Sequence, residues 1–202
     1  MAEENTTPDP QALRALAHPV RLRMLGSLRI DGPSTASRLA EQLGLNTGAT
    51  SYHLRQLAQH GFIEEDADRG NQRDRWWRAT HRFTHVDEAP AEPAARDAAD
   101  AFAQAAVIVQ SQALQRAVEE RPSLPDEWRR VSTSNDVVLR LTPEQAEQLT
   151  RRVVDLMMET YQRTPEPAEP VPGTRTVMFQ FHTFPYPGPT PSADEPDSGS
   201  ER

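Results

Sequence analysis

The 202-residue sequence contains no cysteine, which excludes disulfides, thiolate nucleophiles, iron–sulfur clusters and cysteine-based zinc sites. No run approaches the roughly 20 apolar residues that a membrane helix needs. The acidic N-terminus lacks the basic and apolar regions of a signal peptide, so we expect a cytoplasmic protein. Hydrophobic residues make up only 36% of the chain, beside 18 prolines and 9 glycines. We therefore expect disorder at both ends, in residues 1–8 and in the Pro-rich, acidic tail 185–202.

The net charge of −8 is distributed unevenly along the chain. Residues 1–85 contain 11 arginines and 10 acidic residues, a net charge of +1, whereas residues 86–202 contain 11 arginines and 20 acidic residues, a net charge of −9. All 22 basic residues are arginine. Because the acidity belongs to the second half, the overall charge does not exclude a nucleic acid as the partner of the first half.

The first 60 residues predict four short helices. Capping and helix-breaking residues mark their boundaries: Asp9, His18-Pro19, Asp31-Gly32-Pro33, Ser34 or Thr35, Gly44, and Asn46 or Thr47. In the last two helices, Leu39, Leu43, Leu54 and Leu57 recur at helical spacing and point inward. Two short helices joined by a tight turn at Gly44 form a helix-turn-helix, whose second helix can enter the major groove of DNA.

A β-hairpin is expected directly after these helices. Residues 62–65 and 75–79 are strand-like, and the polar loop 66–73 between them carries glycine, asparagine and arginine. The sequence therefore predicts a wing with an arginine-bearing tip.

Three ordered motifs in residues 11–79 resemble the winged helix-turn-helix domain of ArsR-type bacterial repressors. They are LAHPVRLRML at 16–25, LAEQLG at 39–44 and SYHLRQLAQHGFI at 51–63. The resemblance covers about a third of the chain. Many members of that family sense metals through cysteines on the helix that corresponds to residues 35–43, but this chain has neither cysteine nor histidine there.

The resemblance implies DNA contacts at particular positions. On the second helix of the motif they are Thr47, Ser51, Tyr52, His53, Arg55 and Gln56, and on the wing they are Arg69, Arg73 and Arg75. It also implies a homodimer that binds double-stranded DNA at a palindromic operator and acts as a repressor.

The sequence offers little support for catalysis or for a metal site. It shows no nucleophile paired with a base, no carboxylate pair in an apolar setting and no glycine-rich phosphate loop, so we expect neither an enzyme nor a cofactor. His18 is interpreted as a helix-boundary residue. His81 and His85 would share a face if their segment were helical, which leaves a histidine-based, metal-responsive repressor as an alternative.

The second half predicts a long helix followed by a small α+β module. Residues 87–121 are expected to form a linker and an Ala-rich helix that begins near residue 94 and either pairs with its twofold mate or packs only within its own subunit. Residues 122–184 contain a short helix at 126–131, a strand at 136–141, a capped helix from 143 to about 163 and an alternating strand at 176–184. The two strands are expected to form a small sheet.

The expected fold is therefore mainly α with a small β component, with a winged helix-turn-helix DNA-binding domain at residues 9–86. The C-terminal module either dimerises, encloses an unidentified small-molecule effector, or holds only an ordinary core. Its candidate pocket residues are Met157, Met158, Met178, Phe179 and Phe181. A protein-interaction module that keeps the winged head without binding DNA is the rival interpretation.

Overall fold

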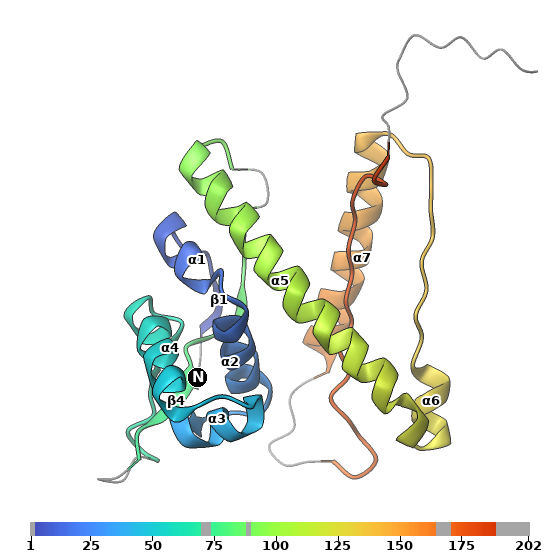
Figure 1. Ribbon diagram of the computed structural model, residues 1–202. Coiled ribbons are helices and arrows are strands. Elements are labelled where there is room, and N and C mark those ends of the chain that lie inside the picture. Colours follow the sequence, from blue (N-terminus) through green and yellow to red (C-terminus); the bar gives the residue numbers. More distant parts are fainter. Residues whose placement is uncertain (1–2, 70–73, 88–89, 165–170, 189–202) are drawn as a thin grey trace, which may run out of the picture. The chain divides into compact units, whose positions relative to one another are not determined.

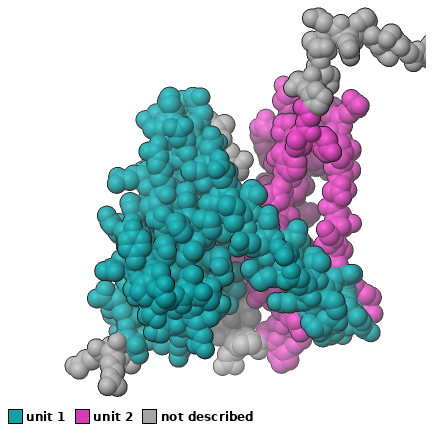
Figure 2. Space-filling model, in the orientation of Figure 1, with its two compact units in different colours: residues 1–129 teal, residues 130–202 magenta. Residues whose placement is uncertain are grey.

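A computed structural model describes residues 3–69, 74–87, 90–164 and 171–188 of the chain. The described part is mainly helical with small sheets, which confirms the predicted fold class. It divides into two compact units, an N-terminal unit (residues 1–129) and a C-terminal unit (residues 130–202) (Figure 2). None of the described helices combines the length and the apolar character needed to cross a lipid bilayer.

The elements follow one another as the sequence pattern predicts over most of the N-terminal unit (Figure 1). In chain order they are β1 (Glu3–Thr6), α1 (Pro10–Leu16), α2 (Pro19–Ile30), β2 (Ser34–Thr35), α3 (Ala36–Leu43), α4 (Thr47–Gln59), β3 (Ile63–Glu65), β4 (Trp76–Ala79), β5 (His81–Thr84), α5 (Pro93–Glu120) and the 3-10 helix η1 (Arg121–Ser123). Helix α6 (Asp126–Val131) spans the boundary between the units, and α7 (Pro143–Arg163) belongs to the C-terminal unit.

Side-chain caps explain where these helices begin. The Ala12 amide donates to Asp9 Oδ1 at 2.7 Å, the Arg38 amide to Thr35 Oγ1 at 3.3 Å, and the Ala49 amide to Asn46 Oδ1 at 2.8 Å. Each bond satisfies an amide that has no partner within its helix. Of the two capping candidates that the sequence offered for each helix, Thr35 caps α3 and Asn46 caps α4.

The core of the N-terminal unit surrounds α2, which contacts α3, α4, β4 and α5. Its buried members come from six helices and strands of the head and from the residue before β3: Leu16, Met24, Leu25, Leu28, Leu39, Leu54, Leu57, Phe62, Ile63 and Trp77. A smaller cluster of Leu13, Ala98 and Ala99 joins α1 to the start of α5. Burial of this apolar surface is the main stabilising contribution to the head.

The predicted wing is present as an antiparallel pair of strands. Strand β4 lies between β2 and β3, with Ile63 opposite Ala79 and Glu65 opposite Trp77. On its other edge, Ser34 lies opposite Trp77, so β2 ties the start of α3 to the wing. The tip of the wing, residues 70–73, lies outside the described residues.

Residues 3–6, which lie within the segment 1–8 expected to be disordered, have strand structure. They form β1, which pairs in parallel with β5, and the His85 amide donates to the Thr6 carbonyl at 2.8 Å. The pairing uses backbone groups only, and the polar sequence EENT carries no apolar periodicity that would have revealed it. Of the expected C-terminal disorder, residues 189–202 lie outside the described residues.

The two strands expected in the C-terminal unit, 136–141 and 176–184, are not formed, and neither is their sheet. Both segments lack helical or strand structure, and their apolar side chains are exposed, as at Val137 (76%) and Phe179 (75%). Apolar alternation indicates a face that favours burial, but it does not specify a partner strand.

A half-buried arginine joins α2 to the strand that follows the wing. Arg29 Nε donates to the His81 carbonyl at 2.9 Å, and its Nη2 donates to Thr84 Oγ1 at the same distance. Burial lowers the pKa of Arg29 to about 10, so the guanidinium is still charged at neutral pH. These bonds fix β5, and with it the chain that leads to α5, against the head.

Gly44 offers a test of the turn between α3 and α4. Its φ of 66° is left-handed, and a Cβ added there would meet no atom within 4 Å, so backbone strain alone opposes substitution. We expect Gly44→Ala to lower the free energy of unfolding by about 1 kcal/mol in urea titrations followed by tryptophan fluorescence.

Gly26→Ala is the matched control, because Gly26 lies inside α2 with equally open space. Its substitution should raise stability by about 0.5–1 kcal/mol, since alanine restricts the unfolded chain and favours the helix. Equal shifts of the same sign in both variants would contradict a special backbone conformation at Gly44.

Candidate nucleic-acid interface

Helices α3 and α4 form a helix-turn-helix, and their buried side chains fix how the two helices are oriented. Leu39 and Ala40 of α3 and Leu54 and Leu57 of α4 are buried in the head. Thr50 is also fully buried, and its hydroxyl donates to the Asn46 carbonyl at 3.0 Å. Because these inward positions are fixed, the opposite side of α4 is presented to solvent.

All six residues proposed on the second helix of the motif lie on α4. Thr47, Tyr52 and Arg55 are exposed, whereas Ser51, His53 and Gln56 are half-buried. Two of these side chains are oriented by bonds along the helix: Arg55 Nε donates to the Ser51 carbonyl at 3.2 Å, and Gln56 Nε2 donates to Gln59 Oε1 at 3.4 Å. The solvent-facing surface of α4 is therefore polar, with both donors and acceptors.

The arginines proposed on the wing are found in different settings. Arg69 is exposed, and its Nε lies 3.6 Å from Asp66 Oδ2. Arg75 Nε lies 3.1 Å from Glu65 Oε2. The Arg75 guanidinium also lies over the Trp77 ring, 5.6 Å from its centroid. Arg73 lies outside the described residues.

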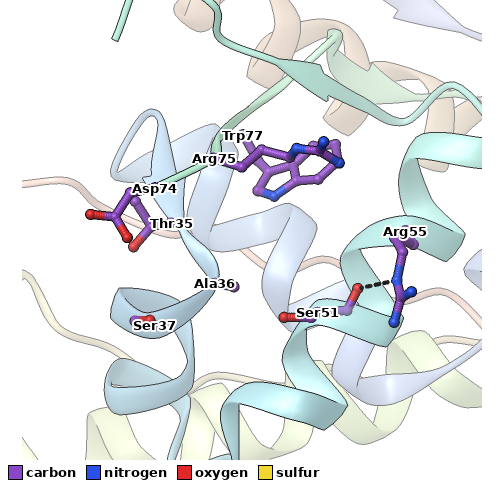
Figure 3. A pocket seen from close by; sticks show the side chains of 8 residues that line it. All are labelled: Thr35, Ala36, Ser37, Ser51, Arg55, Asp74, Arg75 and Trp77. Atoms are coloured by element: carbon purple, nitrogen blue, oxygen red, sulfur yellow. Dashed lines mark hydrogen bonds between the residues drawn. The ribbon is translucent and has the colours of Figure 1, made fainter. Parts of the chain in front are cut away.

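A shallow hollow of about 260 Å³ brings the start of α3, the middle of α4 and the wing together (Figure 3). It is lined by Thr35, Ala36, Ser37, Ser51, Arg55, Asp74, Arg75 and Trp77. Three of the proposed contacts, Ser51, Arg55 and Arg75, thus border one concave surface. The N-terminus of α3 adds a partial positive charge to the two guanidinium groups, and Asp74 opposes them.

Sequence reasoning missed the contribution of α3 to this surface. Thr35 and Ser37 border the hollow, and Arg38 lies over the Trp76 ring at 4.8 Å. The available signal was the capping residue at the start of α3, because a helix N-terminus attracts anions whatever side chains follow it.

Two histidine rings lie against each other, tilted by 49°, beside α4. The rings of His18 and His53 lie 4.7 Å apart, and Tyr52 packs edge-on against His53 at 5.4 Å. His18 Nδ1 accepts from the Val20 amide at 3.2 Å, so His18 caps α2, consistent with its interpretation as a helix-boundary residue. Among the described atoms, His53 Nδ1 and Arg21 Nε are buried without a hydrogen-bond partner.

This environment favours the neutral form of both histidines. Burial lowers the pKa of His18, and the Arg21 guanidinium lowers it further. Burial also lowers the pKa of His53, with added repulsion from His18 and Arg21. Burial similarly lowers the pKa of Arg21, while Tyr52 counteracts the shift. The cluster is thus a site where added positive charge is unfavourable until an anion approaches.

His81 and His85 do not share a helical face. His81 begins β5 and His85 follows that strand, so the segment is extended. Residues four apart in a strand are separated by about 13 Å, too far to hold one ion between them. Within the described residues, no group of three or more histidine, aspartate or glutamate side chains is placed to hold a metal.

Comparison with known proteins identifies one domain in the chain. Residues 16–66 match a family model described as a helix-turn-helix domain. No curated protein matches the chain. A structure of a mutant of Lactococcus lactis ZitR in its apo form is 15% identical, covers 71% of this chain and 82% of its own, and gives a TM-score of 0.30, which is too low to carry an argument. The chain therefore carries a helix-turn-helix domain, the type of domain with which transcription regulators bind DNA.

The histidine cluster predicts a pH-dependent stability. Because the pKa values of His18 and His53 are lowered in the folded state, the unfolded chain takes up protons first as the pH falls below about 6.5. We expect the urea midpoint to fall between pH 7.5 and pH 5.5, and His53→Gln to reduce that fall.

His182→Gln is the control, since it removes an exposed histidine from the C-terminal unit. A pH dependence that His53→Gln and His182→Gln leave equally unchanged would show that the cluster does not govern stability in this range.

Proposed function

We propose that this chain is a sequence-specific DNA-binding transcriptional regulator, not an enzyme, and that it acts as a homodimeric repressor at a palindromic operator. The observation that carries the proposal is the polar, solvent-facing side of α4 beside the hollow lined by Arg55 and Arg75. In this proposal α4 enters the major groove and the wing contacts the flanking backbone.

The hollow suits a phosphate of the DNA backbone. Ser37 and Ser51 offer hydroxyl donors, Arg55 and Arg75 offer guanidinium groups, and the N-terminus of α3 supplies oriented amides. A phosphate bound there would fix the register of α4 in the adjacent groove without itself reading sequence. Tyr52, Gln56 and Thr47 would then contact base edges or neighbouring phosphates.

The wing arginines must give up ion pairs to bind phosphate. Arg75 is paired with Glu65 and Arg69 with Asp66, and both arginine side chains are more than half exposed. The Arg75–Glu65 pair is exposed at both ends and contributes only about 0–1 kcal/mol, so a phosphate with its higher charge density can displace it, whereas Asp66 in the other pair is buried. The same pairing is the observation that favours a second candidate, an interaction module in which the wing is neutral and DNA is not bound.

Helix α5 supports the proposed dimer. Its first half packs on α1 and α2, but large apolar side chains of its second half are exposed: Val107, Ile108, Leu114 and Val118. An apolar stripe of this kind favours association with a twofold mate, which would hold two copies of α4 at the spacing of two half-sites.

Repression would follow from occupancy of the operator, which blocks polymerase. Release would require a ligand that binds the free and DNA-bound forms with different affinities.

The proposal is tested by fluorescence anisotropy with DNA from the protein's own promoter region and a scrambled duplex at two salt concentrations. Tight, salt-dependent binding that prefers the promoter duplex is expected of a sequence-specific regulator. Equally weak binding to both duplexes would favour the interaction module.

Arg75→Ala and Arg55→Ala should each weaken binding to both duplexes and reduce the slope of log affinity against log salt by about 0.9 per lost phosphate contact. Arg78→Ala is the matched control. Arg78 lies on the same strand as Trp77 but on its other face, does not line the hollow, and is also ion-paired, with Glu64 at 2.9 Å. Equal slopes for Arg75→Ala and Arg78→Ala would count against the phosphate site.

Gln56→Ala should instead reduce the preference for the promoter duplex, by about 1–3 kcal/mol if its amide contacts a base edge. The salt slope should stay at the wild-type value, because no charge is removed. Loss of affinity for both duplexes to the same extent would show that Gln56 does not read sequence.

A further inference from the structure

The C-terminal unit contains a long helix and two extended segments, but its described residues form no buried core. Among its described residues no side chain is buried, including all of α7. Yet α7 begins with a complete capping box between Thr142 and Gln145 and runs for 21 residues. A capped amphipathic helix is stabilised mainly by burying its apolar face, so the described surroundings of α7 are incomplete.

The apolar face of α7 is only partly covered. Residues along one side are half-buried: Ala146, Thr150, Val153, Met157 and Tyr161. Thr150 Oγ1 donates to Thr183 Oγ1 at 3.2 Å, which places the last extended segment against this side. Next to it, Leu149 and Leu156 remain exposed, Leu156 at 63%. Half of the apolar stripe thus lacks a cover among the described residues.

Each extended segment also presents one apolar face. Side chains alternate in an extended chain, so Val137, Leu139 and Leu141 share a face of the first segment. Val177, Phe179 and Phe181 share a face of the second, and all six are exposed. The unit therefore contains a helix and two strand-like segments, each with an apolar face, that do not cover one another.

The exposed area is comparable to that of a protein interface. Four aromatic residues of the last segment, Phe179, Phe181, Phe184 and Tyr186, are between 40% and 77% exposed. At 150–250 Å² for each buried aromatic, they alone expose about 500 Å². A standard interface buries about 800 Å² on each partner, so these residues supply more than half of it.

The chemistry of this surface points to a protein partner. Residues 130–187 contain 6 arginines and 7 acidic residues, a net charge of −1, so the surface neither attracts DNA nor repels a copy of itself. The last segment carries three phenylalanines, a tyrosine and a methionine, residue types that are enriched at the centres of protein interfaces.

We propose that the C-terminal unit is completed by the same unit of a second chain, with residues 136–141 of one chain pairing against residues 176–184 of the other. A twofold axis makes every such contact twice. The exposed apolar segments of each chain would then be covered by the same segments of the other chain. The inference rests on the proposed homodimer and adds a second contact surface to the apolar stripe of α5. The exchange also explains why the predicted sheet is absent from a single chain.

The first test compares the dimer dissociation constants of full-length variants by sedimentation equilibrium. The wild type should associate into a species of two 22.6-kDa chains. Leu156→Arg and Phe179→Asp should each raise the dissociation constant at least tenfold, because each buries a charge in the interface. Asp155→Arg is the control, because it adds an arginine beside Leu156 on the opposite, polar face of α7.

A monomeric wild type, or a dissociation constant that Leu156→Arg and Asp155→Arg change to the same small extent, would overturn the proposal. Folding is monitored in the same samples by circular dichroism and by the urea midpoint of the head. Because Leu156 and Phe179 are exposed in the single chain, neither substitution should alter that midpoint.

The second test uses the absence of native cysteine. Leu139→Cys and Phe179→Cys chains are prepared separately, mixed and oxidised, so that any disulfide between the two positions must join different chains. The mixed dimer should exceed the homodimers of either variant on a non-reducing gel. In the double variant, a disulfide found only within one chain would show that the chain covers its own segments and would overturn the exchange.

These outcomes separate the inference from the proposed function. If the wild type dimerises through these segments but binds neither duplex, the regulator proposal fails and the inference stands. If the promoter duplex is bound tightly by a monomer that Leu156→Arg does not alter, the inference fails and DNA recognition stands.

Discussion

The burial of Leu54 and Leu57 beneath α2 is the constraint on which the rest of the head depends. These two leucines fix the rotation of α4 about its axis, so the residues between them are turned either into the core or toward solvent. The same core holds Trp77 of the wing and Leu39 of α3, which brings the hollow's three walls together. The polar outer side of α4 is thus determined by the packing of its apolar inner side.

Sequence reasoning located the helices of the head because their signals are local. Asp9, Gly44 and Thr142 act through backbone groups within a few residues, so the sequence alone reveals them. Strand β1 and the hollow depend on pairing and proximity between distant segments, which no local pattern encodes. The strand-like segments of the C-terminal unit show the same limit, since alternation specifies an apolar face and leaves the partner undefined.

The two units differ in how much of their apolar surface is buried. The N-terminal unit contains every buried side chain among the described residues, whereas the C-terminal unit contains none. A chain segment that cannot bury its apolar faces does not offset the entropy lost on folding. For such a segment, order is linked to association, so its stability is a property of concentration as well as of sequence.

Helix α2 contacts both α4 and α5. It packs against α4 on one side and α5 on another, and Arg29 clamps it to the strand that leads into α5. The position of α5 is therefore tied to the helix that also supports α4. Helices α1 and α2 thus both contact α5, which does not line the hollow, and α4, which does, so the packing of α5 and that of α4 depend on the same two helices.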